Sequence, residues 1–178
     1  MNNSNNDKKN INANSKIYYD VKRNFKDQIE KIKDQLDNYD KRSENLHNKS
    51  NDLIMSKCGI LYMNYSKEHL EKHISFEDNS TESSKKFKSC KKYYTHDIIE
   101  YIQYNRNYFS KIEGDFKDLL ANCDNEFILE NNENNLKRCY SEAFQSYISN
   151  MVKFINVNSE ILPKKEMYIY KIISSTNV

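Results

Sequence analysis

Apolar side chains recur every seven residues through the first third of the chain, and no position of the series is missed. Taken as the d positions of a heptad repeat, they are Tyr18, Phe25, Ile32, Tyr39, Leu46, Leu53 and Ile60. The a positions, four residues after each d position, are apolar at Ile29 and Leu36 and polar elsewhere. We call these apolar residues together the seam. Because a strict seven-residue repeat stays on one face only if the helix supercoils around a partner, the seam predicts a left-handed coiled coil. The alternative is one amphipathic helix that lies on its own bundle.

Two further helical patterns follow a polar stretch. Residues 75–89 are rich in Ser and show no periodicity, which indicates a loop. The second pattern alternates spacings of four and three through Ile98, Ile102, Asn105, Phe109, Ile112, Phe116, Leu119 and Cys123. After a connector at 131–135, the third runs through Leu136, Tyr140, Ala143, Tyr147, Asn150, Phe154, Val157 and Ile161. Pro163 is expected to end this helix, and the segment 167–173 fits either a short strand or a docking helix.

The lengths of these patterns limit the architecture. One helix over residues 18–72 would be roughly 80 Å long, whereas a compact domain of this size has a radius of gyration of about 16 Å. The helix should therefore break near Gly59 or project as a rod. We expect an all-α fold in which a long coiled-coil helix continues into an antiparallel three-helix bundle. The expected parts are a disordered Asn-rich tail (1–15), a coiled-coil rod (16–52), the bundle (53–162) with a loop at 75–90, and a C-terminal tail (163–178).

Composition argues against several classes of function. The chain has only 2 Gly and 1 Pro, so a glycine-rich phosphate loop and a turn-rich β fold are not expected. No run of apolar residues is long enough for a transmembrane helix. With 28 Lys plus Arg against 26 Asp plus Glu, and with Arg scarce, nucleic-acid binding is not predicted. No local motif suggests a nucleophile with its base, so we expect no catalysis and no cofactor.

Two clusters deserve a chemical test. His69, His73, Cys90 and His96 would meet where the predicted loop joins two helices, and imidazole and thiolate groups are ligands for structural zinc. Their spacing matches no compact zinc finger, so no metal site is predicted. The second cluster interleaves lysines and aromatic residues: Lys85, Lys86, Phe87, Lys88, Lys91, Lys92, Tyr93 and Tyr94. It has the chemistry to bind an anionic surface, but a solvated loop is the preferred interpretation.

Cys123 and Cys139 lie eight residues on either side of position 131, in the middle of the connector. An antiparallel hairpin would place them at similar heights, within reach of a disulfide. In a cytosolic protein, two reduced and buried cysteines are the preferred interpretation, as for Cys58 in its apolar segment. The hairpin resembles the helix–loop–helix of the twin-cysteine families of the mitochondrial intermembrane space. Those families carry two cysteines on each helix, whereas this hairpin has one, so membership is not inferred.

The sequence thus predicts a non-enzymatic interaction protein, a structural or adaptor subunit of a larger helical assembly. It would bind a protein partner or a second copy through the seam, because an uncovered apolar stripe needs a partner. The Asn-rich start lacks the apolar stretch of a signal peptide, so a cytoplasmic location is expected. The alternative is a disulfide-stapled helical-hairpin protein of the mitochondrial intermembrane space.

Overall fold

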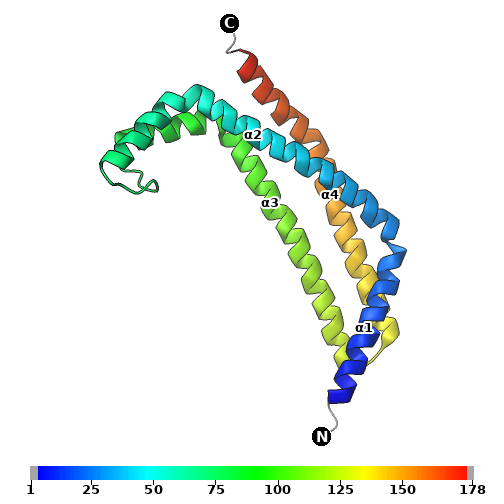
Figure 1. The fold of residues 1–178 in the computed structure, drawn as a ribbon. Helices are drawn as coiled ribbons and strands as arrows, with labels where there is room; N and C mark the ends of the chain where they lie inside the picture. Colours follow the sequence, from blue (N-terminus) through cyan, green and yellow to red (C-terminus); the bar gives the residue numbers. More distant parts are fainter. Residues whose placement is uncertain (1–3, 176–178) are drawn as a thin grey trace. The chain divides into compact units, whose positions relative to one another are not determined.

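Four helices form the chain in the computed structural model, which describes residues 4–175 (Figure 1). They are α1 (Ser4–Asn24), α2 (Lys26–Glu71), α3 (Glu82–Glu130) and α4 (Glu133–Ser174). No strand occurs among the described residues, so the predicted all-α class is confirmed. Within the same range, no helix combines the length and the apolar character that a membrane crossing requires.

The first break in the helical chain falls at Phe25 rather than near Gly59, which lies inside α2. The Phe25 N–H donates to the Lys22 carbonyl at 3.0 Å, a tighter bond than the i→i−4 bond of an α-helix. The Asn-rich start also differs from the expected tail, because α1 begins at Ser4. Buried Ile17 and Val21 fix this helix further along. Residues 1–3 of the predicted tail lie outside the described residues.

The connection between α2 and α3 is shorter than the predicted loop at 75–90. His73 takes a left-handed conformation (φ 53°), and the Ile74 N–H donates to the His69 carbonyl at 3.0 Å, as in a Schellman C-cap. α3 then begins at Glu82 because Thr81 is its N-cap, with Oγ1 accepting from the Ser84 N–H at 3.1 Å. The Ser- and Lys-rich stretch that read as a loop is therefore the first part of a helix.

The connection between α3 and α4 is tight. Asn131 is left-handed (φ 51°), and its N–H donates to the Phe127 carbonyl at 2.7 Å. Asn132 caps α4, accepting at Oδ1 from the N–H groups of Asn134 and Asn135 at 3.1 and 3.2 Å. The connector therefore lies within the predicted segment 131–135 but is shorter, because residues 133–135 already belong to α4.

The end of α4 corrects a prediction. Pro163 lies inside α4, which continues to Ser174, so the segment 167–173 is helical rather than a strand. A proline normally interrupts a helix because it lacks an N–H. Here Leu162 and Ile169 are buried on either side of it, and their packing holds the helical path.

The chain divides into two compact units, and not into the predicted rod and bundle. Unit 1 contains the described residues up to Tyr39 together with Arg106–Asn158. Unit 2 contains Asp40–Asn105 and the described residues from Ser159 onward. The helices α2, α3 and α4 each contribute to both units.

Unit 1 contains parts of all four helices, which form two apolar clusters. The first cluster joins α1, α3 and α4 through Ile17, Val21, Cys123, Phe127, Leu136, Tyr140 and Phe144. The second joins α2, α3 and α4 through Ile32, Ile112, Met151 and Phe154. Aromatic rings knit both clusters, with Phe144 against Phe25 and Phe116 at centroid distances of 5.5 and 5.2 Å.

Unit 2 holds α4 alongside α2 by polar contacts. Arg42 donates to both carboxylate oxygens of Glu166, at 3.1 and 2.7 Å, and this bidentate bond raises the pKa of Arg42. Further along, the Lys49 ammonium donates to the Tyr170 hydroxyl and lies 4.0 Å from the centroid of its ring. Residue numbers rise together along both helices, so α4 runs parallel to α2.

Candidate functional site

The seam has neighbours within the chain over most of its length. Its residues in unit 1 all belong to the two apolar clusters: Tyr18, Phe25, Ile29, Ile32, Leu36 and Tyr39. In unit 2, Leu46 and Leu53 are each only 1% exposed. The premise that the seam lacks a partner inside the chain is therefore wrong up to Leu53. A coiled coil with another chain stays a prediction.

The seam emerges from cover at Ile60, which is 78% exposed. Met63 and Leu70 are 69% and 65% exposed on the same side of α2, and we call these three residues the outer face. At about 100° per residue, the outer face points away from Cys58 and Tyr65, which are buried on the side facing α3. A Cβ built on nearby Gly59 would meet nothing within 4 Å. This side of α2 therefore combines three exposed apolar residues with the exposed ion pair of Lys67 and Glu71 at 3.8 Å.

The end of α4 explains why the outer face is uncovered. α4 contacts α2 at Arg42 and Lys49, and these positions share a heptad stripe with Met63. α4 reaches its last residue, Ser174, only four residues beyond Tyr170, the partner of Lys49. Further along α2 the stripe continues without its third helix. The outer face therefore lies on the side of α2 that α4 contacts at Arg42 and Lys49, but beyond the last residue of α4.

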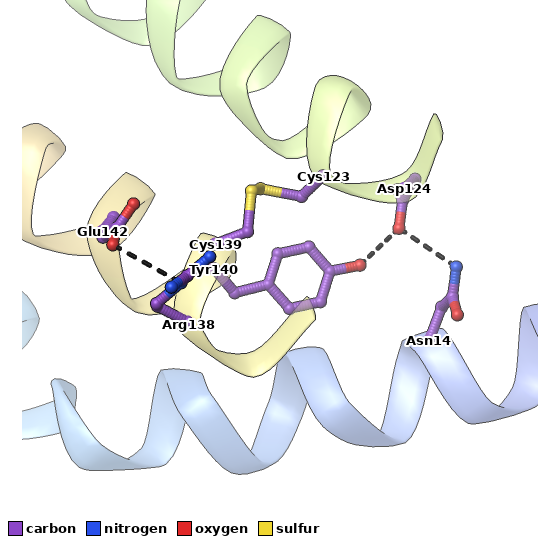
Figure 2. The surroundings of a disulfide bond; sticks show 7 residues. All are labelled: Asn14, Cys123, Asp124, Arg138, Cys139, Tyr140 and Glu142. Atoms are coloured by element: carbon purple, nitrogen blue, oxygen red, sulfur yellow. Dashed lines mark hydrogen bonds and ion pairs between the residues drawn. A yellow bond between two sulfur atoms is a disulfide. The ribbon is translucent and has the colours of Figure 1, made fainter. Parts of the chain in front are cut away.

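The two cysteines weighed as a disulfide are bonded in the structure (Figure 2). Cys123 on α3 and Cys139 on α4 have Cα atoms 5.7 Å apart, across the short connector. The preferred prediction of two reduced thiols is therefore wrong for this pair. The antiparallel packing that the sequence argument used to place the two residues is nevertheless the packing observed.

A polar group next to this disulfide ties three helices together (Figure 2). The Asp124 carboxylate accepts from the Tyr140 hydroxyl and from Asn14 Nδ2, the latter at 3.2 Å. Burial, reinforced by the bond to Asp124, raises the pKa of the Tyr140 phenol above its ordinary value. The outward-facing Arg138 pairs with Glu142 at 4.0 Å. This arrangement holds α1 against the stapled hairpin and offers no nucleophile.

A second disulfide was missed by the sequence reasoning. Cys58 on α2 and Cys90 on α3 are bonded, with Cα atoms 6.0 Å apart. The signal was available: both cysteines lie sixteen residues from position 74, as Cys123 and Cys139 lie eight from 131. The pairing was not predicted because the Ser-rich stretch was interpreted as a loop. That interpretation placed Cys90 at the end of a loop, whereas it lies inside α3.

This pairing also removes the thiol from the group considered for zinc. His69 is buried against Tyr65 and Phe76, at centroid distances of 4.4 and 5.5 Å. His96 pairs with Glu100 at 3.1 Å, and His73 forms the exposed C-cap of α2. Among the described residues no group of three or more His, Cys, Asp or Glu is placed to hold a metal ion.

Charged contacts close the turn between α2 and α3. The Glu68 carboxylate accepts from Lys72 Nζ at 2.6 Å and from the Ser83 hydroxyl. These two bonds, the one to Lys72 first, lower the pKa of Glu68 to about 2. The end of one helix is thus fastened to the start of the next.

Comparison with known proteins adds no relative. No family model matches the chain, and no curated protein or solved structure matches it either. The candidate functional features are therefore those of the chain itself: the outer face of α2, the two interhelical disulfides and the lysines of α3.

Proposed function

We propose that this protein is a non-enzymatic interaction protein, a structural or adaptor subunit of a larger helical assembly. The observation that carries the proposal is the outer face, the exposed apolar continuation of a stripe that α4 contacts further back. The occupant we assign is an amphipathic helix of a different protein, which would lie along α2 in line with the place of α4. It would complete a three-helix arrangement that α2 and α3 alone leave open.

The size of the outer face indicates how long the partner helix must be. Burial of an Ile, a Met and a Leu side chain contributes about 5–8 kcal/mol, whereas association itself costs about 4–15 kcal/mol. The three residues alone would therefore give weak binding. A partner helix that also covers Met55 and Gly59 would follow α2 over about 22 Å, at ~1.5 Å per residue, and would add the missing contact area.

The disulfides favour the second candidate for the protein's setting, an oxidising compartment. All four cysteines of the chain are paired, and each pair joins neighbouring helices of a hairpin. Such bonds persist in oxidising compartments and are rare in the cytosol. We therefore propose a disulfide-stapled interaction protein, with the mitochondrial intermembrane space as the compartment suggested by the resemblance, in place of the cytoplasm. Mass spectrometry of native protein alkylated before reduction should find both pairs protected, and four alkylated thiols would overturn this part.

The docking proposal is tested by a photocrosslinking amino acid placed at Met63 in the native cell. We expect crosslinked peptides from an amphipathic helix of one other protein, and loss of that product when Ile60 is changed to Asp. The matched control places the crosslinker at Leu129, an exposed apolar position on α3 in unit 1. Equal products from both positions would contradict the proposal. A wild-type dimer that Ile60→Asp makes monomeric would identify a second copy as the occupant and overturn the assignment to a different protein.

A further inference from the structure

The start of α3 presents a continuous basic surface. Lys85, Lys88 and Lys92 are exposed and fall within an arc of about 60° on this helix, at ~100° per residue. Buried Ile98 lies about 110° from the middle of this arc, whereas buried Thr95 lies at its edge, one heptad after Lys88. We call these three lysines the lysine face. Because they lie on a helix capped at Thr81, and not in a loop, their charges are held in a fixed row about 10 Å long at ~1.5 Å per residue.

The lysine face carries more positive charge than the carboxylates around it offset. No Asp or Glu occurs from Ser83 to His96. Of the nearby acidic residues, Glu82 pairs with Lys86 at 3.5 Å and Glu100 with His96 at 3.1 Å. Asp97 lines the groove beside Tyr93, and the pKa of Asp78 is lowered chiefly by hydrogen bonds from Ser80 and in smaller part by the charge of Lys88. Within the described part of the chain, none of the three lysines of the face forms a salt bridge. The surface therefore keeps a net positive potential toward solvent.

Aromatic rings border the lysine face. Tyr93, the residue after Lys92, is 79% exposed, so its ring lies at the surface and not in the core. Lys92 and Tyr93 line an open groove of about 440 Å³ in unit 2, which also contains one acidic residue, Asp97. Its other lining residues are Ser89, Tyr94, His96 and Tyr168. Tyrosine is the side chain typical of the boundary between water and lipid headgroups, where its ring and its hydroxyl are both accommodated.

We propose that the lysine face binds the surface of a membrane rich in anionic lipids. Lysine acts as a point charge that needs no particular geometry, and this stretch contains none of the arginines that bidentate recognition of phosphates and bases would use. A membrane surface attracts each such lysine independently, so affinity grows with their number. The lysine face lies on α3 and the outer face on α2, so the two surfaces share no residue. This inference does not depend on the proposed docking function.

The experiment is cosedimentation of the full, oxidised chain with vesicles of phosphatidylcholine containing about one-third phosphatidylserine or cardiolipin. Each lysine contributes roughly fivefold to partitioning, so K85Q/K88Q/K92Q should weaken binding about a hundredfold. Binding should also fall as salt is raised. The matched control, K33Q/K111Q/K117Q, removes the same charge from exposed lysines of unit 1 and should bind like wild type.

Four results would overturn the assignment. If the triple variant and the control lose vesicle binding equally, the binding depends on the net charge of the protein and not on the lysine face. Equal binding to pure phosphatidylcholine vesicles would remove the electrostatic basis. Tighter, lysine-dependent binding to duplex DNA than to vesicles would make the surface a nucleic-acid site instead. Loss of vesicle binding in I60D/M63D would show that the outer face of α2, and not the lysine face, contacts the lipid.

Discussion

Removing the Cys58–Cys90 disulfide should destabilise the protein more than removing Cys123–Cys139. The first bond joins residues 32 apart and the second joins residues 16 apart. In the chain-entropy model, such loops contribute about 4 and about 3 kcal/mol, because the cross-link restricts the unfolded chain. Each value is a large share of the 5–15 kcal/mol that typically separates folded from unfolded domains, as an order of magnitude.

The location of the effect should differ as well. Beyond Leu53, α2 is covered by α3 alone, so Cys58–Cys90 fastens a two-helix segment, whereas Cys123–Cys139 lies within the three-helix packing of unit 1. Loss of the first bond should therefore speed amide hydrogen exchange mainly in 54–71 and 82–98. Loss of the second should act mainly around the connector at 131–132.

The assay compares C58A/C90A, C123A/C139A and wild type by urea unfolding and by hydrogen exchange with mass spectrometry. Wild type treated with reductant serves as a further reference, because it loses both disulfides without any substitution. If C58A/C90A keeps the wild-type unfolding midpoint and exchange pattern, the bond does not form or does not fasten the hairpin. If both double variants destabilise only unit 1, the reasoning from cover by neighbouring helices is wrong.

Three further variants test the packing and the charges. Phe144→Ala should cost about 3–5 kcal/mol in urea unfolding, because it empties a site surrounded by Tyr18, Phe25 and Phe116. Since the pKa of Tyr140 is raised in the folded state, the stability it contributes is complete below about pH 10 and is lost as pH rises further. Tyr140→Phe should flatten that alkaline decline in unfolding titrations. The pKa of Glu68 is lowered to about 2, so its contribution is present above the ordinary value of 4.5 and is lost as pH falls through 2. Glu68→Gln should lower the melting temperature at neutral pH and reduce its acid dependence, and an unchanged acid dependence would contradict the role of the turn.

The helices were predictable where one period of apolar residues persists over several turns. The stripes from Ile98 to Cys123 and from Leu136 to Ile161 both lie in helices of the structure, and the connector at 131 was placed correctly. The start of α3 was not predicted, because its Ser residues indicated a loop, whereas Thr81 caps the helix and Lys is itself a good helix former. Pro163 misled for a related reason: its intrinsic preference is outweighed by the burial of Leu162 and Ile169.

The disulfides show how one misplaced boundary propagates. Cys123 and Cys139 could be paired from sequence because the centre of their connector was known. The same symmetry about position 74 would have paired Cys58 with Cys90, had the end of α2 been recognised. That end carries no glycine; His73 adopts the left-handed conformation instead, which only a few per cent of non-glycine residues do. Because the turn at His73 contains no glycine, the sequence did not predict it, and without that turn the Cys58–Cys90 bond was not predicted either.

The seam could not by itself distinguish an outside partner from an inside one. A seven-residue repeat fits helices that pack at a shallow crossing angle, and this geometry occurs both in coiled coils between chains and in bundles within one chain. The helical patterns at 98–123 and 136–161 indicate a partner within the chain, because together they extend far enough to cover most of α2. Cover ends where α4 ends, and from that point the repeat still continues: Ile60 is the next seam residue after buried Leu53. Because the repeat continues past the part of α2 that α4 covers, it favours a helix from another chain as the partner there. The expected contact is then limited to the last turns of the seam and does not include its whole length.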